Sequence, residues 1–350
     1  MPSPEPALRF GVHSGQQYET YDALLTLWRR AEVLGYDWCS LFDHLRPPMG
    51  GPDGPCFEGT TLLSALTAQT SRIRGALMVA PVAWRHPAML AALAATIDHV
   101  GAGRVEIGIG VGGADLAHEQ YGIAQPDRAE RLEMLEETAA VLRGLWSGEE
   151  FSYAGKHFRI TQGHLRPAPV QPRLPLVVGG ASPPVLRVVA RHGDVWNSLL
   201  TDPDRYRRRV EQLDRECARA GRDRAEIRVS MTFRALLVDN PAELPGRLDR
   251  LRAAFPPDSP VWPEYLVFGT PEQCVEALLP YRELGVTDFV LGARPPVDWD
   301  SVTLFAERVI PHLRPASPRR EPNVRPRTTP RNTTVPSARP ERCPQEGKPV

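Results

Sequence analysis

Cysteine is scarce and scattered in this sequence. The 350 residues contain five cysteines, an odd number, and none of them has the spacing of a metal site. A fold held by disulfides is therefore not expected, and no residue is assigned as a metal ligand. The simplest interpretation is a protein of the reducing cytoplasm.

Long hydrophobic runs and an excess of one charge are also missing. No apolar stretch follows the first six residues, so no signal peptide is expected, and no segment is long enough to span a bilayer. The 42 Lys and Arg residues balance the 42 Asp and Glu residues, so the formal net charge is zero. This balance argues against nucleic acid as the main partner. The sequence predicts a cytoplasmic protein that binds a small molecule, with no membrane and no nucleic acid as partner.

The sequence does contain strand-like segments that alternate with helical ones, and 42% of its residues are hydrophobic. The expected strands are residues 8–13, 36–42, 73–81, 105–109, 174–178, 194–199, 227–238 and 287–291. A helical pattern follows each strand. Repeated strand–helix units imply a parallel sheet, and eight of them predict a closed (β/α)8 TIM barrel with insertions.

Three segments fall outside the eight units. Residues 151–160 alternate around Ala154-Gly155 and predict a hairpin insertion, and residues 265–268 predict a short extra strand. The end of the chain is rich in Pro, Arg, Thr and Ser and has almost no large apolar residue. Such a segment cannot bury enough surface to offset its ordering entropy. The predicted organisation is a barrel domain at 1–314 and a disordered tail at 315–350.

Residues 101–113 join a β-branched strand to a cluster of glycines. The segment 108–113 formally matches the dinucleotide pattern Gly-x-Gly-x-x-Gly, which requires a helix to open at its last glycine. Two helix breakers, Gly122 and Pro126, follow instead. The end of a barrel strand is the favoured interpretation, and a Rossmann unit is the minor alternative.

In a TIM barrel the active site lies at the carboxyl ends of the strands. Asp43 and His44 follow the second strand directly. His44 is a candidate proton donor or acceptor near neutral pH, and Asp43 can accept hydrogen bonds from a heterocycle. The structural alternative is that His44 caps a loop and Asp43 caps a helix.

The same rule selects other residues at strand ends. The candidate substrate contacts are His13, His86, Asn197 and Arg294. The turn Gly179-Gly180-Ala181-Ser182 runs from a strand into a helix, where free N–H groups and the helix dipole favour phosphate. A tight turn with no ligand is the alternative for these four residues.

Several short motifs occur together in a specific order. They are Asp43-His44, Ala80-Pro81, Arg85-His86-Pro87, Gly101-x-Gly-Arg104, Gly108-x-Gly110, Tyr121-Gly122, Ala129-Glu-Arg-Leu132, Val178-Gly-Gly180 and Gly269-Thr-Pro-Glu272. In this order and spacing the chain resembles the luciferase-like monooxygenase superfamily over residues 8–313, and most closely its branch that uses the deazaflavin coenzyme F420.

The resemblance implies a flavin-like cofactor at the carboxyl-terminal mouth of the barrel, and a homodimer. It implies His44 as the catalytic residue and Asp43 as a contact of the cofactor ring. A bulge in the third strand, with a cis peptide matched to Leu77-Met78, would back the ring. The glycine-rich strand ends would hold the ring edge and the phosphate. These cofactor-binding positions are Gly110, Gly112, Gly113, Gly179, Gly180, Ala181 and Ser182.

The predicted function is hydride transfer between coenzyme F420 and a small organic substrate. Sugar-phosphate dehydrogenases of this branch carry a glutamate and a tryptophan where this chain has Gly113 and Pro48, so the resemblance implies the cofactor rather than that substrate. A two-component monooxygenase that uses reduced FMN and O₂ is the first alternative. A barrel without catalysis that serves as a binding protein is the second.

Overall fold

The computed structural model describes residues 7–48, 53–113, 116–253, 266–293 and 296–314. The predicted tail at 315–350 and the candidate Arg294 lie outside the described residues. Across the described part of the chain, no helix combines the length and apolar character that a membrane span needs.

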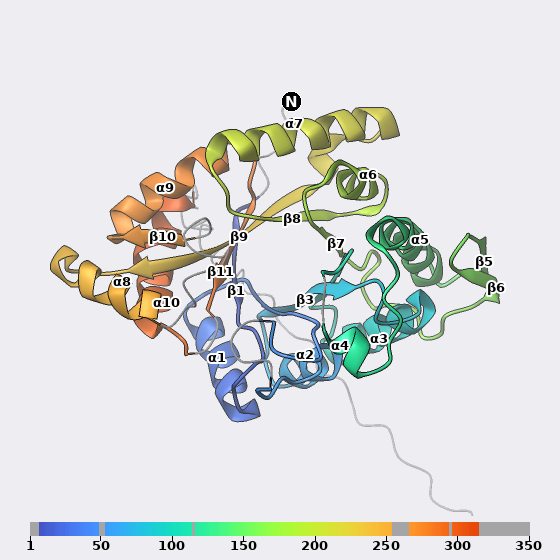
Figure 1. Ribbon diagram of the computed structural model, residues 1–350, viewed down its shortest axis with the longest axis horizontal. Coiled ribbons are helices and arrows are strands. Elements are labelled where there is room, and N and C mark those ends of the chain that lie inside the picture. Colours follow the sequence, from blue (N-terminus) through green and yellow to red (C-terminus); the bar gives the residue numbers. More distant parts are fainter. Residues whose placement is uncertain (1–6, 49–52, 114–115, 254–265, 294–295, 315–350) are drawn as a thin grey trace, which may run out of the picture. The chain divides into compact units, whose positions relative to one another are not determined.

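Eight parallel strands close into a barrel (Figure 1). In order around the barrel they are β1 (Arg9–His13), β2 (Trp38–Leu41), β3 (Arg74–Pro81), β4 (Val105–Gly110), β7 (Leu176–Gly179), β8 (Val195–Leu199), β9 (Arg228–Leu237) and β11 (Asp288–Gly292). The pairing of β8 with β9 and of β11 with β1 completes the ring. The TIM-barrel prediction is confirmed. The Rossmann alternative is wrong, because a dinucleotide-binding sheet is open and this one is closed.

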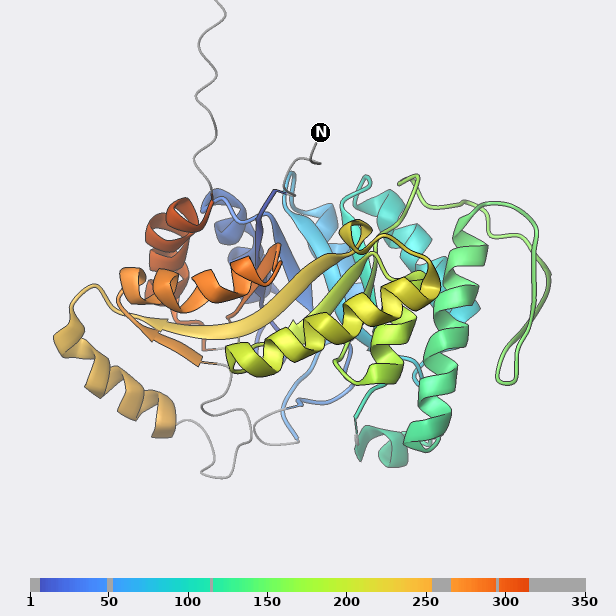
Figure 2. The ribbon, with the colours of Figure 1, turned by 90° about the horizontal axis from the view of Figure 1, so that it is seen from above.

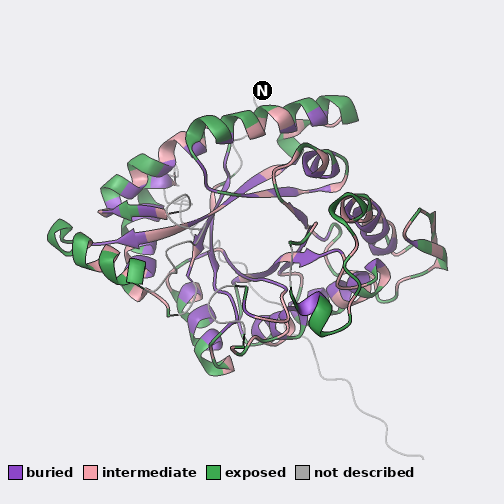
Figure 3. Ribbon diagram, in the orientation of Figure 1, coloured by how far each residue is buried: buried purple, intermediate pink, exposed green. Residues whose placement is uncertain are grey.

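Helices surround the strands as an outer layer, seen from a second side in Figure 2. They are α1 (Tyr21–Val33), α2 (Gly59–Ala68), α3 (Pro87–Val100), α5 (Arg128–Trp146), α6 (Pro183–His192), α7 (Pro203–Ala220), α8 (Leu244–Ala253), α9 (Pro271–Glu283), α10 (Trp299–Leu304) and α11 (Ile310–Leu313). Their exposed residues face outward and their buried residues face the strands (Figure 3). Local signals set the helix ends: Thr270 begins α9 with a capping box, and Gly221 ends α7 at φ 65°.

Three smaller elements decorate the barrel. The predicted hairpin is present as β5 (Phe151–Ala154) and β6 (Arg159–Gly163), away from the barrel strands in Figure 1. The extra strand β10 (Leu266–Gly269) pairs with β9. Helix α4 (Leu116–Gln120) was not expected, because five residues are too few to show a helical period.

Charged side chains fill the amino-terminal end of the barrel. Arg9 Nη1 lies 2.6 Å from Glu106 Oε1, although their strands β1 and β4 are not neighbours, so this ion pair crosses the interior. Arg9 also binds Asp288 at 2.9 Å, and Arg74 binds Glu106 at 2.9 Å. Burial alone would raise the pKa of Glu106, but the charge and hydrogen bonds of Arg9 lower it to about 2. The network fills this end of the barrel, and the candidate site residues lie at the opposite, carboxyl-terminal end.

Side chains alternate along a strand, so the inward positions above this network follow directly. Gly11 is the next inward residue of β1, and a Cβ there would lie 2.4 Å from the ring of Trp38. The missing side chain makes room for the indole, which packs with Ala76, Met78 and Val290. His13 is the third inward residue of β1 and reaches the carboxyl-terminal mouth.

Candidate functional site

The Asp43 carboxylate is held by an ion pair. Arg85 binds it through both guanidinium ends, with Nη2 3.0 Å from Oδ1, and the same Nη2 lies 2.5 Å from Glu58 Oε1. The Asp43 side chain is only 1% exposed. Burial raises the pKa of the Asp43 carboxyl above its ordinary value, and the charge of Arg85 opposes this. The helix-cap alternative for Asp43 is wrong, since Glu58 caps α2 and Asp43 does not.

This geometry changes the role that the resemblance implies for Asp43. Both carboxylate oxygens already accept from Arg85, and the group is covered, so the ion pair occupies part of its hydrogen-bonding capacity. The backbone oxygen of Asp43 also accepts a hydrogen bond from Trp84 Nε1 at 3.1 Å. Asp43 therefore links the segment between β2 and α2 to the segment after β3.

His44 comes next in the chain and is partly exposed. Its ring meets the buried ring of Phe42 edge-on, with centroids 5.5 Å apart. Its carbonyl accepts from Cys56 Sγ at 3.4 Å. The main chain on one side of His44 is thus fixed by Asp43, while its imidazole keeps access to solvent. A held backbone and an accessible ring are what a proton donor at a barrel mouth requires.

The bulge in β3 is present, one residue later than expected. The cis peptide joins Met78 and Val79, not Leu77 and Met78, and the pairing of β3 with β4 shifts between Leu77 and Ala80. The sequence prediction of a cis bond at Leu77-Met78 is therefore wrong by one position. Val79, the second residue of this cis peptide, needs space for its side chain at the bulge.

That room comes from three glycines on the neighbouring strands. A Cβ would approach the Val79 methyl groups to 2.8 Å at Gly108, 2.6 Å at Gly110 and 3.0 Å at Gly179. All three values are at or below the limit of ordinary carbon contacts, so side chains there would collide with Val79. The glycine-rich ends of β4 and β7 therefore make room for Val79, and these glycines together with Val79 form the glycine floor at the barrel mouth.

Gly112 and Gly113 continue this floor to the rim. Gly112 has φ 74°, a left-handed conformation that favours glycine, and a Cβ there would meet Pro81 at 3.0 Å. Gly113 is exposed, and nothing lies within 4 Å of a Cβ placed on it. Gly112 thus has a structural reason to be glycine, while Gly113 borders open space.

The turn between β7 and α6 contains a buried polar atom without a partner among the described residues. Gly180 has φ 122°, its N–H donates to Asn197 O at 3.0 Å, and its carbonyl accepts from Trp196 Nε1 at 2.6 Å. Ser182 stands at the N-cap of α6 but makes no capping hydrogen bond. Its Oγ is buried and has no hydrogen-bond partner within the described residues. The turn is rigid, and it presents one polar atom that lacks a partner.

Three of the candidate substrate contacts fall in described parts of the chain. His13 is buried, with Nδ1 2.8 Å from Ser40 Oγ, and Asn197 Nδ2 donates to Ser230 Oγ at 3.0 Å. Both side chains lie inside the barrel near its mouth. His86 differs: it is exposed, and its Nδ1 accepts from Ala88 N at 3.2 Å as the N-cap of α3. The structure assigns His86 a helix-capping role.

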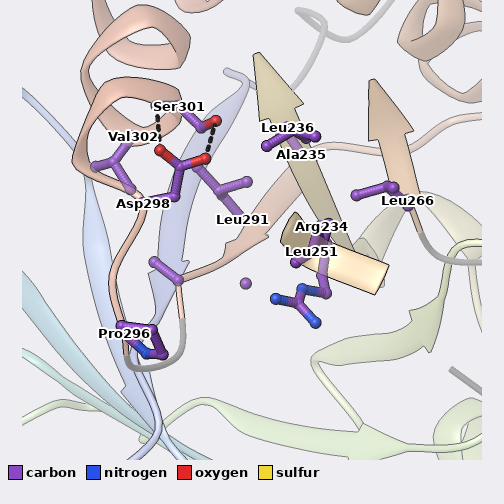
Figure 4. Close-up of a pocket in the computed structure, with 12 residues that line it drawn as sticks. Arg234, Ala235, Leu236, Leu251, Leu266, Leu291, Pro296, Asp298, Ser301 and Val302 are labelled. Carbon is purple, nitrogen blue, oxygen red and sulfur yellow. Dashed lines mark hydrogen bonds between the residues drawn. The ribbon is translucent and has the colours of Figure 1, made fainter. Parts of the chain in front are cut away.

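Two features of the mouth were not expected from the sequence. The rings of Trp84 and His118 stack with centroids 4.2 Å apart, joining the segment after β3 to α4. Arg234 has the inward register of β9 and lines a cavity of about 70 Å³ at the ends of β9 and β11 (Figure 4). Burial lowers the pKa of Arg234. The polar alternation of Arg228, Ser230, Thr232 and Arg234 along β9 was the signal for this inward cation.

The cavity in Figure 4 lies apart from the predicted cofactor-binding positions, since none of those residues lines it. Asp298 on its wall accepts from Ser301 N at 3.3 Å and from Ser301 Oγ at 2.6 Å, shown as dashed lines, and so begins α10. These contacts cap the first turn of α10.

The closed barrel carries the bulge in β3, the glycine floor and the Asp43-His44 segment at one mouth. Residues 7–265 match the family model described as luciferase-like monooxygenase. The chain belongs to the luciferase-like monooxygenase family, as the sequence predicted.

Relatives with assigned activities include users of a deazaflavin. The chain is 26% identical over 333 residues to an F420-dependent glucose-6-phosphate dehydrogenase of Microbacterium testaceum (strain StLB037), covering 88% of this chain and 98% of the relative. It is 32% identical over 206 residues to an F420-dependent hydroxymycolic acid dehydrogenase of Mycobacterium tuberculosis (strain ATCC 25618 / H37Rv), covering 57% of this chain and 56% of the relative. A structure of an F420-dependent secondary alcohol dehydrogenase in complex with an F420-acetone adduct superposes with a TM-score of 0.75 at 19% identity, covering 88% of this chain and 100% of the other. This last likeness concerns the fold.

Proposed function

We propose that this protein is an oxidoreductase that uses coenzyme F420 to oxidise or reduce a small organic substrate. Similarity to an F420-dependent dehydrogenase over nearly the whole barrel carries the proposal. The site supports the proposal, because the partly exposed His44 and the glycine floor both lie at the carboxyl-terminal mouth of the barrel. When bound, the deazaflavin supplies a ring carbon that accepts or releases hydride.

The residues present fit such a group. The glycine floor around Val79 offers a surface for an aromatic ring, and a Cβ at Gly110 would displace Val79 from its place in that floor. The buried Ser182 Oγ without a partner suits an anionic oxygen of the cofactor. Gly180 is held rigid by Trp196 and Asn197, so the turn keeps its shape before the ligand arrives.

His44 moves the proton that accompanies hydride transfer. Its imidazole donates a proton to the substrate oxygen in reduction, or accepts one from it in oxidation. Hydrogen bonds from Trp84 Nε1 to Asp43 O and from Cys56 Sγ to His44 O hold the main chain that carries the ring, which lowers the cost of reaching the reactive arrangement. His13 and Asn197 supply further polar atoms on the inner wall, and we propose that they contact the substrate.

The first alternative is a monooxygenase that uses reduced FMN and O₂, which the family description also covers. The monooxygenase would consume O₂ and reduced FMN, whereas the F420-dependent oxidoreductase would need neither. A screen of alcohols, aldehydes and sugar phosphates under exclusion of O₂ should bleach or restore the visible absorbance of F420 with at least one substrate class. Turnover that requires reduced FMN and consumes O₂ would favour the alternative. A protein that binds neither cofactor would favour the barrel without catalysis.

The homodimer and the absence of a nucleic-acid partner remain predictions. Light scattering after size-exclusion chromatography tests the first. A filter-binding assay with duplex DNA at physiological salt tests the second.

A further inference from the structure

A strongly basic groove lies beside the candidate phosphate turn. It has a volume of about 560 Å³ and lies between the start of α6 and the first half of α7, which pack side by side (Figure 1). The residues that line it are Ala181, Ser182, Pro183, Arg205, Arg208, Arg209, Gln212 and Arg215. Four of these eight are arginines, and no acidic side chain is among them. The groove shares Ala181 and Ser182 with the proposed cofactor site.

The arginines form one face of α7. Positions 205, 208, 209, 212 and 215 follow the spacing of one helix side. At 1.5 Å per residue they extend over about 15 Å, much longer than a single phosphate. An occupant that meets the whole face must therefore be extended and carry several negative charges.

Protein contacts leave much of this charge without a counter-ion. Within the described residues no ion pair shorter than 4 Å is found for Arg205 or Arg208, and both are exposed. Arg208 does interact electrostatically with Asp202, the N-cap of α7, which does not line the groove. Arg215 donates only to the neutral Gln212, at 2.8 Å. Arg209 is anchored at the inner wall by Ser198 Oγ at 3.0 Å. The neighbouring Arg207, by contrast, pairs with Asp204 and does not line the groove.

The start of α6 has few hydrogen-bond donors of its own. A helix N-terminus usually binds an anion through its free N–H groups, but the first two residues of α6, Pro183 and Pro184, have none. At the turn itself Ser182 is the side-chain donor for an anion, and positive charge for a longer ligand comes from the facing helix. Ser182 Oγ is the buried polar atom without a partner, and the arginines of α7 stand opposite.

We infer that this groove binds the oligoglutamate tail of coenzyme F420. The inference rests on the proposed function. Beyond its phosphodiester, F420 carries a chain of γ-linked glutamates, each with a carboxylate, and arginine is well suited to bind carboxylates. FMN ends at its phosphate and has no group to fill the groove. The arginine face of α7 thus selects the deazaflavin by its tail, at a distance from the reacting ring.

The test measures the dissociation constant of F420 with no glutamate and with several glutamates, at low salt. For the unaltered protein the long-tailed form should bind roughly 5- to 30-fold more tightly, the effect of about two exposed ion pairs. Arg208→Gln should reduce this ratio, and Arg205→Gln with Arg208→Gln should abolish it. Affinity for the form without glutamate should stay within about twofold in both variants, because exposed charges contribute little beyond their own partners.

Arg207→Gln is the matched control, since it removes the same charge one position away and outside the groove. It should leave the ratio unchanged, and thermal unfolding curves should confirm that all variants fold. Equal binding of both F420 forms by the unaltered protein would overturn the tail site and leave the proposed function standing. An Arg207→Gln effect as large as that of Arg208→Gln would also overturn it. Failure to bind any form of F420 would overturn both.

Discussion

Arg85 binds both oxygens of Asp43, and its Nη2 also lies 2.5 Å from Glu58 Oε1. This links the segment after β2, which carries His44, to the segment after β3. The aspartate that the resemblance assigns to the cofactor ring is thus already committed to a protein cation. We propose that Asp43 acts on catalysis through the position of His44.

Asp43→Asn should therefore act on stability as well as on turnover. Removing one partner of a buried ion pair leaves the other without compensation, and we expect a loss of roughly 3 kcal/mol in the free energy of unfolding. Denaturant titration measures it. Asp204→Asn, which breaks the exposed pair with Arg207, is the control and should cost less than about 1 kcal/mol. A large loss of F420 affinity with unchanged stability would show instead that Asp43 touches the ring.

His44→Ala should lower kcat by about 10²- to 10⁴-fold, the usual range for a lost general acid or base. The dissociation constant of F420 should change little, because the glycine floor and the turn at Ser182 remain. Steady-state kinetics and a cofactor titration on the same preparation separate the two effects. His86→Ala is the comparison: it removes a helix cap and should cost about 1 kcal/mol of stability while kcat is retained. Undiminished turnover in His44→Ala would remove the proton-transfer role.

Gly110→Ala should damage the site by steric conflict with Val79, since its Cβ would lie 2.6 Å from Cγ2. Overpacking of this kind costs about 1–3 kcal/mol and should displace the bulge that floors the cofactor site. Val79→Ala removes the opposing methyl groups, so the double variant should regain part of the lost cofactor affinity. Titration of F420 into the single and double variants forms a thermodynamic cycle. Additive losses would mean that the glycine serves the ligand directly and not Val79.

The Glu106 network predicts a specific acid response. The folded-state pKa of Glu106 is about 2, below its ordinary value of 4.5, so this carboxylate stabilises the fold above pH 4.5. That contribution, roughly 3 kcal/mol from about 1.4 kcal/mol per pKa unit, is lost as the pH falls from 4.5 toward 2. Glu106→Gln should be less stable at neutral pH and should lack this part of the pH dependence.

Unfolding free energies measured between pH 7 and pH 3 test this prediction. Glu211→Gln, on the exposed side of α7, is the control and should follow the unaltered protein. A Glu106→Gln variant with the same acid limb as the unaltered protein would show that other carboxylates determine it.

The sequence predicted the eight barrel strands because each is a short apolar or alternating run bounded by glycine, proline or a helix pattern. It also placed Asp43, His44 and Asn197 at strand ends, since that rule needs only the order of elements. It could not pair Asp43 with Arg85, because 42 residues separate them and the contact depends on two loops packing together. The cis bond was misplaced by one residue because its position depends on Val79 meeting glycines of β4 and β7.

From the sequence, the basic face of α7 could be predicted only as a charged helix surface. The sequence showed a charged helix at residues 203–220, but the spacing of its arginines does not reveal what they face. Only the packing of α6 against α7 places Arg205 and Arg208 beside Ser182. A sequence pattern within one helix cannot reveal a site that forms only when a second element packs against that helix.

The most direct measurement for the whole account is a titration of the purified protein with F420 and, separately, with FMN, each oxidised and reduced. We predict saturable binding of F420 with long-tailed forms preferred, and much weaker binding of FMN in either redox state. Tight binding of reduced FMN without measurable binding of F420 would contradict the account and identify a monooxygenase.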